Sequence, residues 1–186
     1  EAGTGIGKTL AYMASVIPIG LVANKKIIIS TATIALQEQL VEKDLPEFKE
    51  YSGIEFDFLL LKGRRRYVCL SKLDLITQDY KNSFASLPMY PDEESTISKP
   101  DHKQTYEAMI EALTLGKWDG DLDNWQDNLQ GDVWRSVTAD HNECTGRRCP
   151  NISSCYFFQA RHGLEEADVL VTNYNLLLTD LISEGR

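Results

Sequence analysis

The sequence lacks any apolar stretch that approaches the roughly 18 to 20 residues needed to cross a bilayer. It also lacks a signal peptide, and it carries only four cysteines. Together these absences argue against a membrane protein and against an exported, disulfide-stabilised one. We therefore expect a cytoplasmic protein with no membrane partner, whose cysteines are reduced and available to bind metal.

The four cysteines lack the paired Cys-x2-Cys knuckles that structural zinc sites usually have. Cys69 stands 75 positions before Cys144, and Cys149 and Cys155 follow Cys144 at short intervals. Such wide, uneven spacing favours an iron–sulfur cube, whose corners lie farther apart than the ligands of a single ion. From spacing alone, zinc and unligated thiols remain open as alternatives.

Half of an ATP-hydrolysing site is also missing, because no Asp-Glu pair ends an apolar strand anywhere in the sequence. The other half is present at residues 2–9. Glycines there let successive backbone N–H groups curl around phosphate oxygens, while the lysine supplies a charge for the β- and γ-phosphates and the threonine a hydroxyl for Mg²⁺. The loop consists of Ala2, Gly3, Thr4, Gly5, Ile6, Gly7, Lys8 and Thr9.

This loop departs from the strict phosphate-loop pattern in having Ala2 at its first position, which requires a negative φ there. The alternative interpretation is a glycine-rich turn before an ordinary helix. With Gly-Lys-Thr in place we favour the phosphate loop, and we predict that the chain is a piece of a larger nucleotide hydrolase.

The net charge of −9 is unevenly distributed along the chain. Residues 92–143 hold 13 acidic and four basic residues, whereas the remainder holds 15 of each and is neutral. Within that remainder, residues 62–72 carry five basic residues and no acid. The overall acidity therefore does not argue against nucleic acid, because this basic segment could bind a phosphate backbone.

The order of predicted elements is that of an α/β fold. A helix over 8–20, ending near its proline and glycine, precedes a buried strand at 25–30. Thr33 is placed to cap a helix that runs to about residue 41 and stops before Pro46. A second strand is predicted at 54–61, and a third at 167–172 with a helix over 174–182 after it. This alternation is typical of a doubly wound, parallel sheet.

Between these strands the α/β pattern is interrupted by about a hundred residues that contain all four cysteines. Helical spacing is clear only over 104–117, and residues 84–101 have the proline and serine content of a loop. We expect a mainly helical insert that a bound metal group helps to stabilise, because it has few long aliphatic runs.

Several motifs taken together identify a family. They are the phosphate loop, the segment S-T-A-T-I-A-L-Q-E-Q-L at 30–40, K-G-R-R-R-Y-V-C at 62–69, the three-cysteine cluster, and V-T-N-Y-N-L-L at 171–177. In this combination the chain resembles the XPD-like iron–sulfur helicases of superfamily 2, and within them the bacterial DinG branch. The resemblance covers nearly the whole chain.

The resemblance implies a role for each motif. Residues 2–9 correspond to helicase motif I, where Lys8 and Thr9 would act on ATP with Mg²⁺. Thr31 and Thr33 lie in motif Ia, which holds phosphates of single-stranded DNA. A 4Fe–4S cluster would be bound by the four cysteines, Cys69, Cys144, Cys149 and Cys155.

The resemblance also implies an architecture and an activity. Residues 1–61 would begin a RecA-like P-loop motor domain, 62–160 would form the inserted iron–sulfur domain, and 161–186 would return to the motor. The whole protein would be a monomeric 5′→3′ DNA helicase of repair or replication that acts on single-stranded and on forked or branched DNA. The segment ends before the Asp-Glu-x-His box, so alone it is expected to be inactive.

Residues next to the ligand cysteines are the candidates for DNA contact in the insert. Arg64, Arg65 and Arg66 precede Cys69, and we predict that they bind DNA phosphates. Neighbouring aromatic residues could stack on bases or shield the cluster from water. Two rival functions remain open from the residues themselves: another P-loop NTPase with a zinc-bearing insert, and a non-enzymatic module that binds single-stranded DNA.

Overall fold

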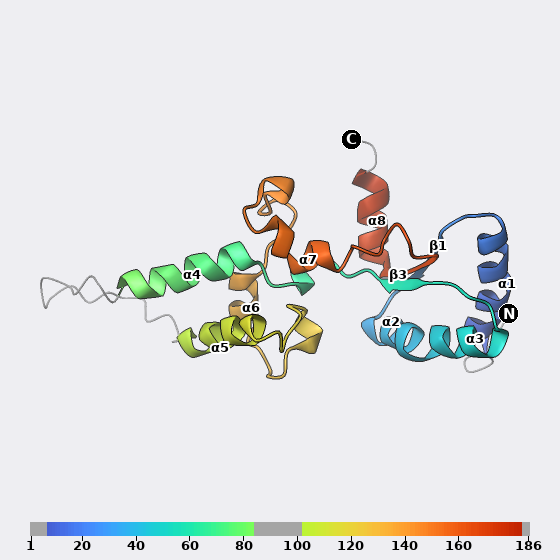
Figure 1. The fold of residues 1–186 in the computed structure, drawn as a ribbon, viewed down its shortest axis with the longest axis horizontal. Helices are drawn as coiled ribbons and strands as arrows, with labels where there is room; N and C mark the ends of the chain where they lie inside the picture. Colours follow the sequence, from blue (N-terminus) through green and yellow to red (C-terminus); the bar gives the residue numbers. More distant parts are fainter. Residues whose placement is uncertain (1–6, 84–101, 184–186) are drawn as a thin grey trace, which may run out of the picture. The chain divides into compact units, whose positions relative to one another are not determined.

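The computed structural model describes residues 7–83 and 102–183 (Figure 1). The chain divides into two compact units. Unit 1 comprises Glu1–Lys62 and Ala160–Arg186, and unit 2 comprises Gly63–Gln159. The loop predicted at 84–101 and the first five residues of the phosphate loop, Ala2 to Ile6, lie outside the described residues.

Unit 1 contains a three-stranded parallel sheet in the order β1-β3-β2. Strand β3 (Val169–Asn173) lies in the middle, with β1 (Ile27–Thr31) and β2 (Phe58–Leu60) on its two sides. In the register, Ile27 and Phe58 both face Val169. Runs of β-branched and apolar residues form these strands. The central strand β3 is buried along most of its length, whereas Ile28 of β1 is exposed. The expected α/β class with parallel strands is confirmed for this unit.

The helices of unit 1 pass through two prolines that were predicted to end them. Helix α1 (Lys8–Val22) continues through Pro18, and Met13 and Ile17 on its inner face are fully buried. Their packing offsets the hydrogen bond that a proline removes. Helix α2 (Ile34–Gln39) leads through a π-helical turn (Leu40–Asp44) into α3 (Leu45–Ser52), whose first turn contains Pro46. A proline is tolerated there because the first turn leaves N–H groups unpaired.

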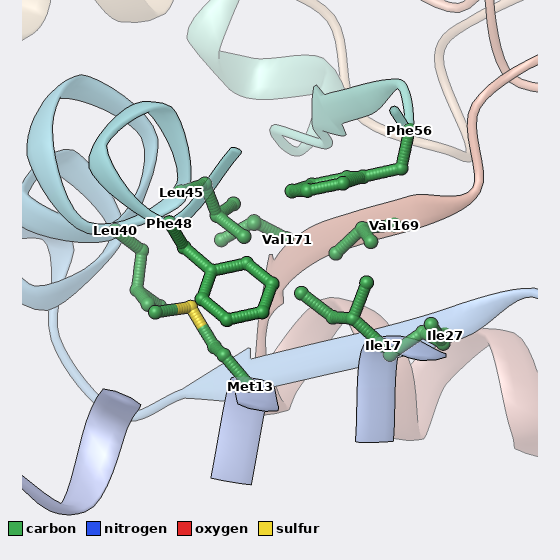
Figure 2. Packing of buried hydrophobic residues seen from close by; sticks show 9 residues of the cluster. All are labelled: Met13, Ile17, Ile27, Leu40, Leu45, Phe48, Phe56, Val169 and Val171. Carbon is green, nitrogen blue, oxygen red and sulfur yellow. The ribbon is translucent and has the colours of Figure 1, made fainter. Parts of the chain in front are cut away.

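The core of unit 1 lies between α1, α3 and one face of the sheet (Figure 2). Phe48 packs beside Phe56, with ring centroids 6.1 Å apart, and both rings lie over Val169 and Val171 of the central strand. Helix α8 (Tyr174–Ser183) follows β3, and Asn173 begins it by accepting a hydrogen bond from the Leu176 N–H at 2.7 Å. No helix in the described ranges is long and apolar enough to cross a membrane.

Unit 2 is mainly helical. Its α-helices are α4 (Leu70–Ser83), α5 (Lys103–Thr114), α6 (Gly131–Val137) and α7 (Tyr156–Gln159). Among the described residues of the unit, four 3-10 turns connect or precede these helices: η2 (Arg64–Arg66), η3 (Leu122–Asn124), η4 (Gly146–Arg148) and η5 (Ile152–Ser154). Within 63–83 and 102–159, extended pairing is limited to two isolated antiparallel bridges, Tyr67 with Asp121 and Val68 with Thr138. The predicted helix near 104–117 is found, and α4 and α6 were not predicted.

The core of unit 2 is built from α4, α5 and α6 around an aromatic cluster. Trp118 lies edge-on to Trp125 and to Trp134, with ring centroids 4.6 and 6.3 Å away. The indole N–H of Trp118 donates to the Asp121 carbonyl at 2.6 Å, and that of Trp134 donates to the Arg65 carbonyl at 2.8 Å. Met109 and Val137 are fully buried beside them. Unit 2 therefore has a hydrophobic core of its own.

We expect Gly120→Ala to destabilise unit 2. Gly120 has φ of +76°, and a Cβ there would lie 2.6 Å from the ring of Tyr156. The left-handed backbone costs about 1–2 kcal/mol for a residue with a side chain, and the forced movement of the ring costs roughly another 1–3 kcal/mol. Because the three tryptophans of the chain all lie in unit 2, urea unfolding followed by tryptophan fluorescence measures this loss directly.

Gly131→Ala is the matched control for this substitution. Gly131 begins α6, and a Cβ built there has no heavy atom within 4 Å. Alanine also favours a helix over glycine by about 1 kcal/mol. The control should leave the urea midpoint unchanged or raise it slightly. An equal effect of both substitutions would contradict the assigned role of Gly120.

Candidate functional site

The described part of the phosphate loop is its last three residues. Gly7 has φ of +73° and forms the N-cap of α1, and its carbonyl accepts the Ala11 N–H at 3.0 Å. This left-handed conformation suits glycine and strains other residues. Lys8 and Thr9 then occupy the first turn of a 15-residue helix, where the backbone N–H groups and the helix dipole favour an anion.

A cavity of about 860 Å³ adjoins these residues. Gly7, Lys8 and Thr9 line it from one side, and residues of the α2–α3 segment line it from another, including Asp44 and Tyr51. Its volume falls in the range of small-molecule sites. Tyr12 lies one turn after Thr9 on α1, and partial burial raises the pKa of its phenol.

Thr31 and Thr33 lie where β1 passes into α2. The Thr31 side chain is 8% exposed, and its hydroxyl donates to the Thr33 carbonyl at 3.0 Å. Thr33 is the N-cap of α2, and its hydroxyl oxygen accepts the Leu36 N–H at 3.3 Å, as the sequence predicted. Both hydroxyls thus have partners that shape the turn at the carboxyl end of β1, the edge at which parallel sheets bind ligands.

The four predicted metal-binding cysteines belong to one unit, and all are half-buried free thiols. Cys69 immediately precedes α4, and its N–H donates to the Val137 carbonyl at 2.7 Å. Cys144, Cys149 and Cys155 are separated by the two short turns η4 and η5. Burial raises the pKa of Cys69, and the neighbouring sulfurs of Cys149 and Cys144 raise it further. Cys144 and Cys149 therefore both lie near enough to Cys69 to influence its charge.

No group of three or more His, Cys, Asp or Glu side chains in the described part of the chain is arranged to hold a metal ion. Hydrogen-bond donors do face two of the sulfurs, those of Cys144 and Cys149. The Arg64 guanidinium donates to Cys144 Sγ at 2.8 Å, the Gly146 N–H donates to the same sulfur at 3.4 Å, and Ser71 Oγ lies 3.3 Å from Cys149 Sγ. The hydrogen bond with Ser71 lowers the pKa of Cys149. Such donors stabilise thiolates, the form in which cysteine binds metal.

Two ion pairs hold the Cys144 loop against the segment that carries Cys69. Arg65 lies 2.8 Å from Asp140, and Lys72 lies 3.0 Å from Glu143. The two acids also form a reciprocal capping box: the Glu143 N–H donates to the Asp140 carboxylate at 3.0 Å, and the Asp140 N–H donates to the Glu143 carboxylate at 3.0 Å. The bond from Arg65 lowers the pKa of Asp140, and the bond from the Asp140 N–H lowers that of Glu143.

The three arginines predicted to contact DNA each have a partner within unit 2. Arg64 binds Cys144 and also lies 4.1 Å from the ring centroid of Phe157. Arg65 pairs with Asp140, and Arg66 forms an ion pair with Asp123. Contact of these arginines with DNA stays a prediction, but any phosphate would compete with these partners.

The aromatic residues beside the cysteines are mostly part of the core. Tyr67 and Phe157 are 6% and 8% exposed, and their rings meet edge-on with centroids 6.0 Å apart. Phe158 is half-buried and packs on Phe157 at 5.2 Å. Of the two interpretations left open for these residues, shielding of the cysteine region fits the buried rings better than stacking on bases.

Sequence reasoning missed the residues that organise the cysteines: Ser71, Lys72, Asp140 and Glu143. The Asp-x-x-Glu spacing of the last two residues could have been recognised as a capping-box signature. The partners of Ser71 and Lys72 lie about seventy positions away, and no local pattern marks them.

Comparison with known proteins places this chain among helicase sequences, although no protein-family model matches it. It is 42% identical over 185 residues to the ATP-dependent DNA helicase DinG of Photobacterium profundum, and 34% identical over 185 residues to that of Escherichia coli. The aligned region covers 97% and 100% of this chain but only 25% and 26% of those proteins. The chain is therefore homologous to one segment of DinG helicases and spans about a quarter of the relatives it matches.

Proposed function

We propose that this chain is the segment of a DinG-type, ATP-dependent DNA helicase that carries the phosphate loop of the first motor domain and an inserted iron–sulfur domain. The observation that carries the proposal is the 34–42% identity to proteins named ATP-dependent DNA helicase over essentially the whole chain. The similarity includes unit 1 and unit 2 alike. In this proposal the parallel sheet of unit 1 belongs to a RecA-like motor, and unit 2 is its insert.

Within unit 1, Lys8 and Thr9 bind the phosphates of ATP and its Mg²⁺. Their position in the first turn of α1, next to a cavity of small-molecule size, supports this role. The sequence pattern assigns residues 2–7 of the phosphate loop to the same phosphates. Thr31 and Thr33 hold phosphates of single-stranded DNA at the carboxyl end of β1. Acidic residues that complete hydrolysis come from parts of the protein beyond this segment.

Within unit 2, Cys69, Cys144, Cys149 and Cys155 hold a 4Fe–4S cluster. The donors facing Cys144 and Cys149 suit a cluster with anionic sulfur ligands, and the turns η4 and η5 place Cys144, Cys149 and Cys155 within one short stretch of the chain. When bound, such a cluster cross-links four points of the insert. The insert then acts on single-stranded DNA and at the branch point of forked DNA.

We expect the full-length protein to unwind a duplex that has a 5′ single-stranded tail and to leave a duplex with only a 3′ tail intact. This result follows from 5′→3′ movement, because a motor that loads on a 5′ tail moves toward the duplex, whereas one that loads on a 3′ tail moves away from it. Strand release is measured with a fluorophore and quencher on the two strands, in the presence of ATP and Mg²⁺.

A non-hydrolysable ATP analogue is the control for this assay and should give no strand release from either substrate. Equal unwinding of the two substrates would contradict the proposed polarity. DNA binding without any ATP-dependent strand release would favour a binding module over a helicase.

A further inference from the structure

The proposed function requires cations on unit 2 that bind DNA phosphates, and the structure limits which residues these can be. Four cations flank Cys69, and all of them are engaged: Arg64 by Cys144, Arg65 by Asp140, Arg66 by Asp123 and Lys72 by Glu143. The basic character of this segment in the sequence is therefore largely neutralised within the fold.

A phosphate that recruited one of these four cations would have to break an existing interaction. Arg66 and Asp123 are only 30% and 26% exposed, so separating them would leave a poorly hydrated carboxylate next to an anion. The Arg65 side chain is 73% exposed, but releasing it would still free the Asp140 carboxylate, which is 26% exposed, beside the incoming phosphate. The attraction between phosphate and arginine would be offset by the loss of an ion pair and by a new repulsion.

Two other arginines in the cysteine region have no such partners among the described residues. Arg147 and Arg148 are exposed, and within the described residues neither side chain forms a hydrogen bond or an ion pair. They lie on η4 (Gly146–Arg148), between Cys144 and Cys149. No acidic residue occurs anywhere from 144 to 155, so this stretch has a local charge of +2. The acid that directly precedes it, Glu143, is already paired with Lys72.

The turn that presents these arginines is well defined. Gly146 adopts φ of +59°, the Arg148 N–H donates to the Thr145 carbonyl at 3.3 Å, and the Cys149 N–H donates to the Gly146 carbonyl at 3.0 Å. The sulfur of Cys144 accepts the Gly146 N–H at the beginning of the same turn. The backbone under both guanidinium groups is thus fixed by hydrogen bonds, which reduces the ordering cost of binding.

We propose that Arg147 and Arg148 are the residues through which unit 2 binds the phosphate backbone of single-stranded DNA. Because neither guanidinium has an ion pair among the described residues, binding a phosphate breaks none there, and the planar donors match phosphate oxygens. The arginines at 64–66 act instead within the protein, on Cys144, Asp140 and Asp123. This inference rests on the proposed function, because it assumes that unit 2 contacts DNA.

The test measures binding of a fluorescent single-stranded oligonucleotide to the full-length protein by anisotropy, over a range of salt concentrations. For single strands, each phosphate contact contributes about 0.7 to the slope of log affinity against log salt. R147A and R148A should each reduce that slope by about 0.7, and the double variant by about 1.4. R65A should leave the slope nearly unchanged.

R135A is the matched control, because Arg135 is an exposed cation of unit 2 on α6 with no side-chain ion pair among the described residues. It should bind like the unchanged protein. Iron content per chain is measured for every variant. If the double variant loses iron, the salt slopes of the two single variants alone are compared with that of the unchanged protein.

The outcomes separate the two proposals. If the unchanged protein does not bind single-stranded DNA at all, the proposed function fails. If it binds and both R147A and R148A keep its full salt slope, the inference about these two arginines is wrong. A loss of slope in R65A as large as in R147A would also overturn it, because it would return the phosphate contact to the segment before Cys69.

Discussion

Replacing Lys8 by alanine in the full-length protein is expected to reduce DNA-stimulated ATP hydrolysis by roughly 10²–10³-fold, the usual cost of removing one transition-state donor. Lys8 stands in the first turn of α1, directly after a glycine held in the left-handed conformation. Its ammonium group would neutralise charge that develops between the β- and γ-phosphates. Release of inorganic phosphate in the presence of single-stranded DNA measures the effect.

Lys25→Ala is the control for this prediction. Lys25 is an exposed lysine in the turn between α1 and β1, away from the cavity that Lys8 lines. The control should retain full activity, and the Lys8 variant should still bind single-stranded DNA. Normal turnover by the Lys8 variant would remove the phosphate loop from the mechanism.

The second large effect is expected for Cys149→Ser. Protein purified without oxygen should contain about four irons and four acid-labile sulfides per chain, as a 4Fe–4S cluster requires, and the serine variant should lose most of both. A serine hydroxyl can keep the hydrogen bond with Ser71, which now lies 3.3 Å from the Cys149 sulfur. The substitution therefore removes the soft sulfur ligand while keeping the size and polarity of the side chain.

Ser154→Ala, an exposed position next to Cys155, is the control for metal content and should retain its iron. Zinc is measured in parallel. One zinc per chain without sulfide would contradict the cluster and support a P-loop NTPase with a zinc-bearing insert. The same iron content in the Cys149 variant would exclude Cys149 as a ligand.

The sequence predicted which helices and strands unit 1 contains better than it predicted where each of them ends. The isoleucine run of β1 and the apolar run of β3 identify parallel strands by composition alone, but only β3 is buried along most of its length, and Ile28 of β1 is exposed. The continuation of the helix past Pro46 could not be predicted, because the π-helical turn before it depends on packing of Leu40 and Leu45 against the sheet. Local propensity is overruled there by tertiary contacts.

In the candidate site, the residue types that bind metal and phosphate could be recognised, but their partners could not. The run of three arginines has the local appearance of a phosphate-binding segment. Asp140, which holds Arg65, is 75 positions away, and ion pairs over such separations leave no periodic signal in a single sequence. Among the described residues, Arg147 and Arg148 between Cys144 and Cys149 form no such ion pair, a difference from the run at 64–66 that appears only in the fold.

The ion pairs that join the Cys144 loop to the Cys69 segment have a consequence for ligand binding. A site assembled from residues 75 positions apart would ordinarily have to close a long loop, at an entropic cost of about 4 kcal/mol. Here two ion pairs, Arg65 with Asp140 and Lys72 with Glu143, hold the ends of that loop together without a metal group. Part of the entropic cost of bringing these two segments together is therefore met by protein contacts, so a metal group that bound here would not have to meet it.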